Sequence, residues 1–388
     1  MGAHTIVVGG GILGAATFWE LAREGMEPLL YEAGRFGEGP TAKSAAIVRC
    51  HYSNPEVVRM AVRSRDRLRQ LPLHLDCEPV FTQTGWLFLV DDEHAEAAAL
   101  NSIMQDEEGV DSVEVDDLDE YLPGANGAGL AYALFEPEAG FADPVATTLA
   151  YVTAGRRAGG RAEEGTAVEA IEVEAGGAVR GARVAGELVE CEHLVLAAGP
   201  WSAQLAAGIG LSLPLEITRE QDVLYETAPE PSVPCAVSSQ ADAVYLRPVP
   251  ERGDQHLLVG RGFPKEYETV EPDGHDETVD EAFEEDVRRR VVTRLPRLEG
   301  MRAVDGRVGL YDVTPDWHPL LGPVEGYQGL HLATGGSGHC FKLGPAIGEL
   351  VAGAILGKPV GFASVTSFSL SRFAEGRVFS SSYGGNRA

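Results

Sequence analysis

Three glycines near the N-terminus have the spacing of a dinucleotide-binding turn. Gly9, Gly11 and Gly14 form a Gly-x-Gly-x-x-Gly run directly after an apolar segment, and the next apolar segment ends in Glu32. Glycines at these positions let the backbone turn tightly, approach a pyrophosphate and pack a helix against a sheet. The N-terminus of that helix attracts phosphate, and an acidic residue at the Glu32 position can accept hydrogen bonds from a ribose. These residues predict that the chain binds a dinucleotide.

Two later segments have the form of a buried strand that runs into small residues. Residues 194–196 lead into Ala-Ala-Gly, and residues 330–333 lead into Thr-Gly-Gly-Ser-Gly. Both would bring backbone to the edge of the same parallel sheet, where cofactors bind. The second segment opens a helix whose N-terminus could face an electron-rich flavin ring. A nicotinamide enzyme would continue with regular βα alternation, whereas this chain inserts a β-rich stretch, so the pattern favours FAD.

The elements that must position these residues begin with a βαβ unit. Residues 5–8 read as a strand, 12–23 as an amphipathic helix and 28–32 as a second strand, which together require a parallel sheet. Short strands in 167–197 predict an antiparallel meander that returns to a buried strand, and residues 81–90 read as a pair of strands around Gly85. Further helices are expected at 55–71, 92–107, 144–159, 281–295 and 341–356.

The length of 388 residues exceeds the size at which one core usually stops growing, which predicts two domains. We expect an α/β fold: a Rossmann-like FAD-binding domain and a discontinuous antiparallel-sheet (α+β) substrate domain. The FAD-binding domain would comprise residues 1–50, 145–210 and 315–388. The substrate-binding domain would comprise residues 51–144 and 211–314.

The composition excludes several classes of protein. Lys and Arg number 31 against 59 Asp and Glu, so the formal net charge of −28 disfavours nucleic acids and anionic membranes as partners. No apolar run reaches the roughly 18 residues of a membrane helix. The five cysteines are scattered without Cys-x-x-Cys spacing, which predicts neither a disulfide framework nor a metal site. The N-terminus lacks the basic region of a signal peptide, so we expect a cytoplasmic protein.

Several motifs, in this order, resemble the FAD-dependent D-amino-acid oxidase superfamily, and within it most of all sarcosine oxidases and dimethylglycine dehydrogenases. They are residues 7–14, 41–49, 140–144, 196–202, 311–316 and 335–342. The resemblance implies oxidation of an amine carbon by hydride transfer to flavin N5, followed by hydrolysis of the imine.

The resemblance also implies a set of catalytic residues. Arg49 and Lys342 match a cationic pair that holds the substrate carboxylate. Tyr311 matches a pocket tyrosine and Tyr245, more loosely, another, while His339 would contact the flavin as a neutral ring near a helix N-terminus. Purely structural alternatives stay open for these residues. Arg49 could form a surface or interdomain ion pair, Lys342 could contact the flavin alone, and either tyrosine could be an ordinary packing residue.

The cofactor-binding residues that we expect come from the glycine motif, the loop after Glu32 and the later small-residue segments. They are Gly9, Gly11, Ile12, Leu13, Gly14, Glu32, Ala33, Thr41, Ser44, Ala45, Val168, Ala198, Gly199, Trp201, Gly309, Gly336, Gly338, His339, Phe341 and Lys342. We expect non-covalent FAD: Gly309 stands where sarcosine oxidases have the attaching cysteine, and residues 33–45 lack the attaching histidine of dimethylglycine dehydrogenases. Leu258 stands at the position of an oxygen-activating lysine, which favours slow reaction with oxygen.

The expected substrate is a small secondary or tertiary amine or amino acid that bears a carboxylate, similar to sarcosine, dimethylglycine or another N-alkyl amino acid. One alternative is a hydroxy acid or another amine on the same fold. Another is a flavin-binding subunit of a larger complex, with a partner subunit or a protein electron acceptor. A purely NAD-binding regulator fits the pattern least.

Overall fold

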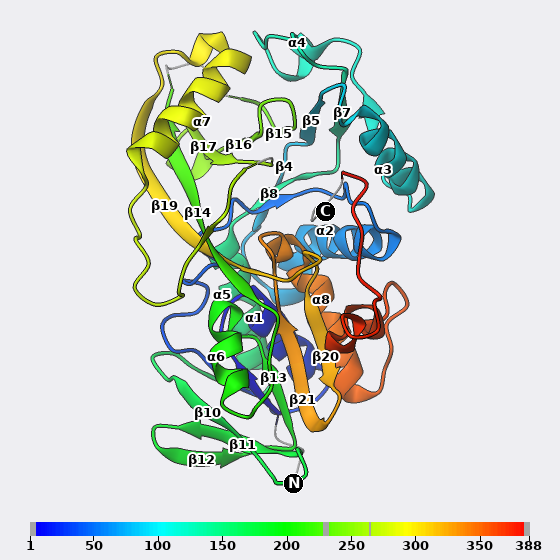
Figure 1. The fold of residues 1–388 in the computed structure, drawn as a ribbon, viewed down its shortest axis with the longest axis vertical. Coiled ribbons are helices and arrows are strands. Elements are labelled where there is room, and N and C mark those ends of the chain that lie inside the picture. Colours follow the sequence, from blue (N-terminus) through cyan, green and yellow to red (C-terminus); the bar gives the residue numbers. More distant parts are fainter. Residues whose placement is uncertain (1–4, 228–232, 264, 384–388) are drawn as a thin grey trace.

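The computed structural model describes residues 5–227, 233–263 and 265–383. It is an elongated molecule with one large sheet toward each end (Figure 1). The mixture of a mostly parallel sheet with a mostly antiparallel one confirms the predicted α/β class. The expected antiparallel sheet of the second half contains one parallel pair, β15 with β5.

A six-stranded sheet lies in the lower half in Figure 1. Its order is β20-β21-β13-β1-β2-β9, with all strands parallel except β20. The central strands are buried on both faces, which explains their continuous apolar sequences. The strands are β1 (Thr5–Val8), β2 (Leu29–Tyr31), β9 (Arg161–Glu163), β13 (His193–Leu196), β20 (Leu320–Val324) and β21 (Tyr327–Thr334).

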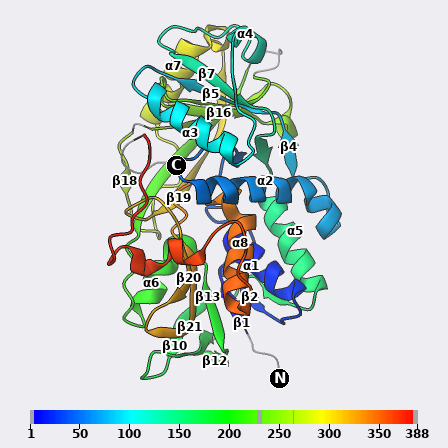
Figure 2. The same cartoon turned by 90° about the vertical axis from the view of Figure 1, so that its right-hand side faces the viewer.

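Helices α1 (Ile12–Arg23), α5 (Pro144–Arg157) and α8 (Cys340–Leu356) pack together beside this sheet. The close approach of α8 to α1 depends on two glycines: a Cβ on Gly344 would lie 2.5 Å from Ile12 Cγ1, and one on Gly348 would lie 2.6 Å from the carbonyl carbon of Ala16. Helix α2 (Pro55–Leu75) crosses above α8 (Figure 2). It runs past the predicted end at residue 71, through Pro72, because Leu71 and Leu75 are buried on the same face.

The predicted meander is a three-stranded antiparallel sheet at the lower end of the molecule. Its strands are β10 (Val168–Val173), β11 (Val179–Val184) and β12 (Glu187–Glu190). Helix α6 (Ser202–Ala207) follows the return strand β13. Short 3₁₀ helices are η1 (Gly199–Trp201), η2 (Pro250–Arg252), η3 (Pro296–Leu298), η4 (Val365–Phe368) and η5 (Leu370–Arg372).

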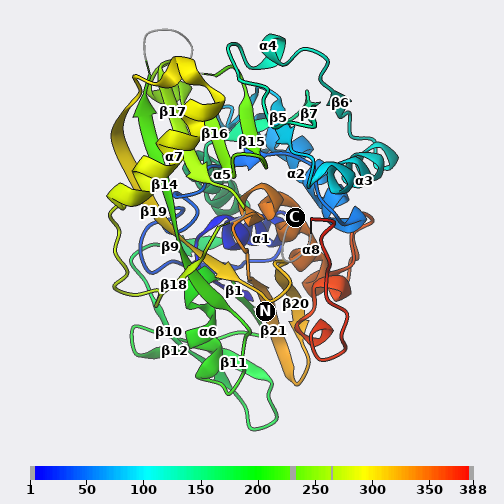
Figure 3. The same cartoon turned by 45° about the horizontal axis from the view of Figure 1, so that its top comes forward.

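A nine-stranded sheet forms the other half, with the order β18-β14-β17-β16-β15-β5-β7-β6 and β19 paired to β14. Helix α7 (Glu281–Arg294) lies over this sheet (Figure 3), and its buried Val287 and Val291 belong to the hydrophobic core beneath it. Helices α3 (Ala95–Glu107) and α4 (Leu118–Tyr121) lie at its far edge in the same view. The strands are β5 (Trp86–Val90), β6 (Val113–Glu114), β7 (Tyr132–Glu136), β14 (Glu216–Glu226), β15 (Ala236–Ser239), β16 (Val244–Pro248), β17 (His256–Arg261), β18 (Glu268–Thr269) and β19 (Arg302–Val313).

A small sheet made of β3 (Ile47–Val48), β8 (Gly140–Ala142) and β4 (Phe81–Gln83) stands between these halves. The strands β4 and β5 flank Gly85 as expected but belong to different sheets, since Gly85 turns the chain with a φ of +77°.

Every strand of the six-stranded sheet comes from residues 1–50, 145–210 or 315–388, and every strand of the nine-stranded sheet from 51–144 or 211–314. On that basis we propose the same division into an FAD-binding and a substrate-binding domain.

Candidate active site

A cavity of about 1090 Å³ begins at the carboxyl ends of β1, β2 and β13 and extends to strands β14, β16 and β19. It therefore lies between the two large sheets. Residues of the glycine turn, of the 33–45 loop and of the N-terminus of α8 line it, as do Arg49, Tyr245 and Tyr311. Among the expected catalytic and cofactor-binding residues, Gly14 alone lies outside the lining.

The glycine turn has no room for side chains. A Cβ on Gly9, whose φ is +104°, would lie 2.4 Å from the Ala197 carbonyl oxygen. A Cβ on Gly14 would lie 1.9 Å from the Gly9 carbonyl oxygen, so Gly14 serves the packing of α1 on β1 rather than the cavity. Gly11, the N-cap of α1, provides no side-chain cap. The N–H of Ile12, the first of α1, donates to Thr41 Oγ1 at 3.1 Å, and the amides that follow it stand at the cavity, in the arrangement that binds a pyrophosphate.

Glu32, at the end of β2, lines the cavity and also fixes the turn around it. One carboxylate oxygen accepts the N–H of Gly10 at 2.6 Å, and the other accepts the N–H of Gly34 at 2.7 Å. Each oxygen keeps a second lone pair for a ribose hydroxyl. The glycine turn without side chains, the N-terminus of α1 and the Glu32 carboxylate together fit the ADP half of FAD.

Arg49 and Lys342 contribute a guanidinium and an amino group to the cavity wall. Both lie over the ring of Tyr52, with the Arg49 guanidinium carbon 4.8 Å and Lys342 Nζ 5.7 Å from its centroid. Arg49 also lies 5.4 Å from the Trp86 ring and donates to the His51 carbonyl. Among the described residues, neither has a carboxylate within 4 Å of its charged nitrogens. Burial, and then the charge of Arg49, lowers the pKa of Lys342 to about 7.

Tyr245 lies on β16 and Tyr311 on β19, both in the nine-stranded sheet. The Tyr245 hydroxyl donates to Asp222 at 2.7 Å, and Asp222 forms an ion pair with Arg307 at 3.2 Å. Arg307 in turn donates to the carbonyl of Ser44 in the cofactor loop. Burial raises the pKa of both tyrosines, and the charge of Asp222 raises it further for Tyr245. Both phenols are therefore protonated at neutral pH.

His339 faces the cavity as a neutral ring. Its Nε2 lies 2.6 Å from the Trp317 carbonyl oxygen, which can only accept, so the proton is on Nε2. Its Nδ1 lies 3.5 Å from the Tyr52 hydroxyl. Burial, and then the charge of Lys342, holds the pKa of His339 well below its ordinary value.

Sequence reasoning missed Tyr52, Asp222, Arg307 and the role of Asp312. The Asp312 carboxylate accepts the N–H groups of Gly335 and Gly336 at 2.7 and 2.9 Å. These two amides, in the glycine-rich loop before α8, are therefore already bonded within the protein. The spacing of Glu220 and Asp222 in one strand could have placed both side chains on one face. The other roles depend on contacts that no local pattern reveals.

Leu258 does not line the cavity. It packs with Leu224 and Val249, and Ala45, which does line the cavity, packs against this cluster. The expectation of slow reaction with oxygen, drawn from Leu258, stays a prediction.

Comparison with known proteins identifies the class of this protein. Residues 4–354 match the model of the DAO family, described as FAD dependent oxidoreductase, so the chain belongs to that family. It is an FAD-dependent oxidoreductase, which confirms the superfamily and the cofactor that the sequence predicted.

Among curated proteins, the chain is 29% identical to glycine oxidase of Pseudomonas putida over 92% of this chain and 95% of that one. It is 27% identical to FAD-dependent oxidoreductase domain-containing protein 1 of Bos taurus over 96% and 85%. Among solved structures, L-proline dehydrogenase from P. horikoshii aligns with a TM-score of 0.88 and 25% identity over 97% of this chain and 99% of that one.

Within the described part of the chain, no helix combines the length and the apolar character needed to cross a membrane.

Proposed function

We propose that the protein oxidises an amino acid, that is, an amine that carries a carboxylate. The observation that carries this proposal is the pair of cations at the cavity wall, Arg49 and Lys342, which we call the carboxylate clamp. Lys342 is buried and Arg49 is half-buried, and no carboxylate of the described residues lies within 4 Å of either charged group. Charges withdrawn from water are normally paired, so this pair points to an anionic ligand. A planar guanidinium beside an ammonium can hold a carboxylate in one orientation.

The similarity to glycine oxidases and to L-proline dehydrogenase supports an amine as the group that is oxidised. Bound FAD would accept the two electrons. The residues of this chain would do the rest: Arg49 and Lys342 orient the carboxylate, while Tyr245 and Tyr311 line the cavity as protonated phenols. We propose glycine-like and secondary-amine amino acids, including sarcosine, N,N-dimethylglycine and proline, as the substrate class.

A substrate panel tests the proposal. Purified holoenzyme is mixed anaerobically with glycine, sarcosine, N,N-dimethylglycine or proline, with the matching 2-hydroxy acids, and with amines that lack a carboxylate. We expect flavin bleaching by at least one amino acid and none by its decarboxylated amine. Bleaching by hydroxy acids alone would replace the amine assignment. Bleaching that requires an added partner protein would favour a subunit of a larger complex.

The FAD is expected to be non-covalent. Gly309 lines the cavity without a side chain, and a Cβ there would lie 2.8 Å from Lys43 Cβ, so a cysteine would have to displace that loop. Acid precipitation of the holoenzyme should therefore release yellow FAD into the supernatant. Flavin that stays with the denatured pellet would contradict this expectation.

Binding of a carboxylate should weaken as the pH rises through about 7. The pKa of Lys342 is about 7 in the ligand-free protein, and a bound anion stabilises its charged form and raises that pKa. Affinity is then fully present below pH 7 and falls by up to about tenfold per pH unit above it. Titration with propionate, which has no amine of its own, measures this profile. Lys342→Met should make it flat, and an unchanged slope in that variant would assign the titration to another group.

A further inference from the structure

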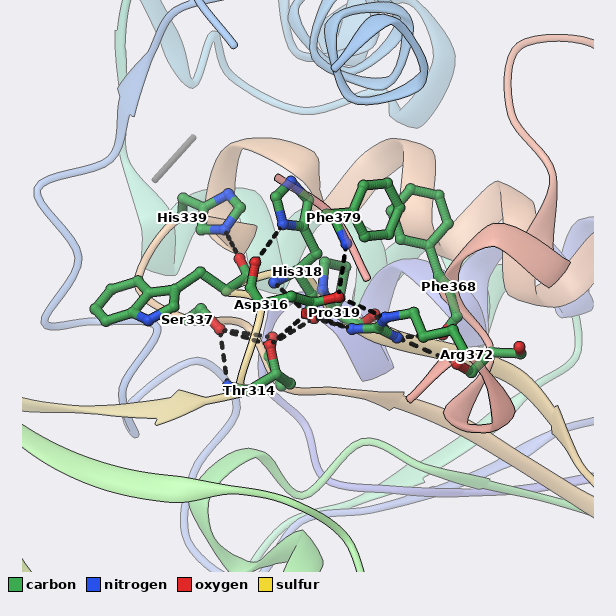
Figure 4. Close-up of polar contacts among 12 residues, drawn as sticks. Thr314, Asp316, His318, Pro319, Ser337, His339, Phe368, Arg372 and Phe379 are labelled. Atoms are coloured by element: carbon green, nitrogen blue, oxygen red, sulfur yellow. Dashed lines mark hydrogen bonds and ion pairs between the residues drawn. The ribbon is translucent and has the colours of Figure 1, made fainter. Parts of the chain in front are cut away.

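A buried ion pair lies behind the cavity, where the C-terminal segment meets the turn between β19 and β20 (Figure 4). The side chains of Arg372 and Asp316 are 0% and 2% exposed, and Arg372 binds both carboxylate oxygens, at 2.7 and 2.8 Å. Its remaining N–H groups donate to carbonyls of the turn, those of His318 and Pro319, and of the C-terminal segment, those of Phe368 and Ser369. Asp316 also accepts from Thr314 and from the N–H of Phe379. A pair this completely bonded fixes the turn.

The turn holds one residue in a costly conformation. Trp317 has a φ of +59°, in the left-handed region that a bulky side chain rarely adopts. Such strain persists where the surroundings over-determine the backbone, and it is frequent at functional sites. Here the N–H of Trp317 bonds the Thr314 carbonyl at 3.0 Å, and Asp316 beside it is locked by Arg372.

The strained residue presents its carbonyl to the active site. The Trp317 oxygen accepts the Nε2 proton of His339 at 2.6 Å, which fixes the tautomer and leaves Nδ1 as an acceptor. Nδ1 faces the hydroxyl of Tyr52, a residue with no exposed surface. The ring of Tyr52 is the surface over which both Arg49 and Lys342 lie.

We propose that the Asp316–Arg372 pair positions the carboxylate clamp, and that it acts through the Trp317 carbonyl, His339 and Tyr52. Arg372 and Asp316 are positioning residues, because neither lines the cavity. This inference rests on the proposed function, since it takes Arg49 and Lys342 as the groups that bind the substrate.

The variant Arg372→Lys tests it, because the charge stays while the bidentate geometry is lost. The first measurement is the tautomer of His339 in ¹⁵N-histidine-labelled holoenzyme, with the resonance assigned by its loss in His339→Gln. We expect a single Nε2-protonated form in the wild type and a mixture of tautomers in Arg372→Lys. The second measurement is propionate affinity, which should fall by about 3- to 10-fold. Arg377→Gln, an exposed C-terminal arginine paired with Glu375, is the matched control and should change neither.

A double-mutant cycle separates positioning from a general loss of stability. Tyr52→Phe removes the hydroxyl that faces His339, and its effect on propionate affinity should not add to that of Arg372→Lys. Should Arg372→Lys fail to yield folded holoenzyme, Thr314→Ala takes its place: it removes the hydroxyl that lies 3.2 Å from Asp316 Oδ1 and 2.8 Å from the His318 carbonyl oxygen, and leaves the ion pair. It should change the tautomer and the affinity in the same direction. Additive losses, or an unchanged tautomer and affinity, would overturn the inference while Arg49→Ala still weakens binding. If Arg49→Ala leaves binding unchanged, the proposed function fails instead.

Discussion

Arg49→Ala is expected to weaken the binding of a carboxylate substrate by tens- to thousands-fold. Removal of one partner from a desolvated charge interaction costs about 2–5 kcal/mol, which corresponds to that range. The guanidinium also fills the space beside the rings of Tyr52 and Trp86, so alanine leaves a gap there. Equilibrium titration of the holoenzyme with propionate, followed by the flavin absorbance, measures the change.

The pKa of Lys342 provides a second measurable change in the Arg49→Ala variant. The charge of Arg49 is one cause of the low pKa of Lys342, so its removal should raise that pKa and move the fall in propionate affinity to higher pH. Arg35→Ala is the control, because Arg35 lines the cavity but is largely exposed and paired with Glu38. If Arg49→Ala and Lys342→Met both bind propionate as the wild type does, the clamp is wrong.

Gly14→Ala is expected to abolish FAD binding. The added Cβ would stand 1.9 Å from the Gly9 carbonyl oxygen, and since that atom is backbone, α1 must move away from β1. The amides at the start of α1 then leave the position where the pyrophosphate binds. The ratio of flavin to protein absorbance after purification measures occupancy, and far-ultraviolet circular dichroism reports whether the chain still folds.

Gly361→Ala is the matched control, because a Cβ there meets nothing within 4 Å. It should retain FAD at the wild-type ratio. A Gly14→Ala protein with full FAD and an unchanged melting temperature would show that the glycine turn is not the pyrophosphate site.

The glycine turn, the strands and the helices could be predicted because each is encoded in consecutive residues. Gly9, Gly11 and Gly14 lie within a few residues of one another, and their spacing alone requires a tight turn. The walls of the cavity were also predicted, since most of their residues follow the carboxyl ends of buried strands.

The ion pairs that hold the cavity walls in place could not be predicted from the sequence. Asp316 meets Arg372, and Arg307 meets Asp222, only after the chain has folded, and neither pair has a spacing that marks it in the sequence. The left-handed Trp317 is equally hidden, because nothing local favours that conformation for tryptophan. The packing of Leu258 with Leu224, Val249 and Ala45 is likewise a contact between distant segments that the sequence does not show.

The order of the strands has a consequence for how the protein acquires its cofactor during synthesis. β21 and α8 are among the last elements to leave the ribosome, yet β21 pairs with β13 inside the six-stranded sheet, and the start of α8 forms part of the cavity wall. A nascent chain that ends before residue 327 therefore has the glycine turn but not the wall that closes over a flavin. FAD capture is thus expected to follow translation of nearly the whole chain, and truncated products should leave the ribosome without cofactor.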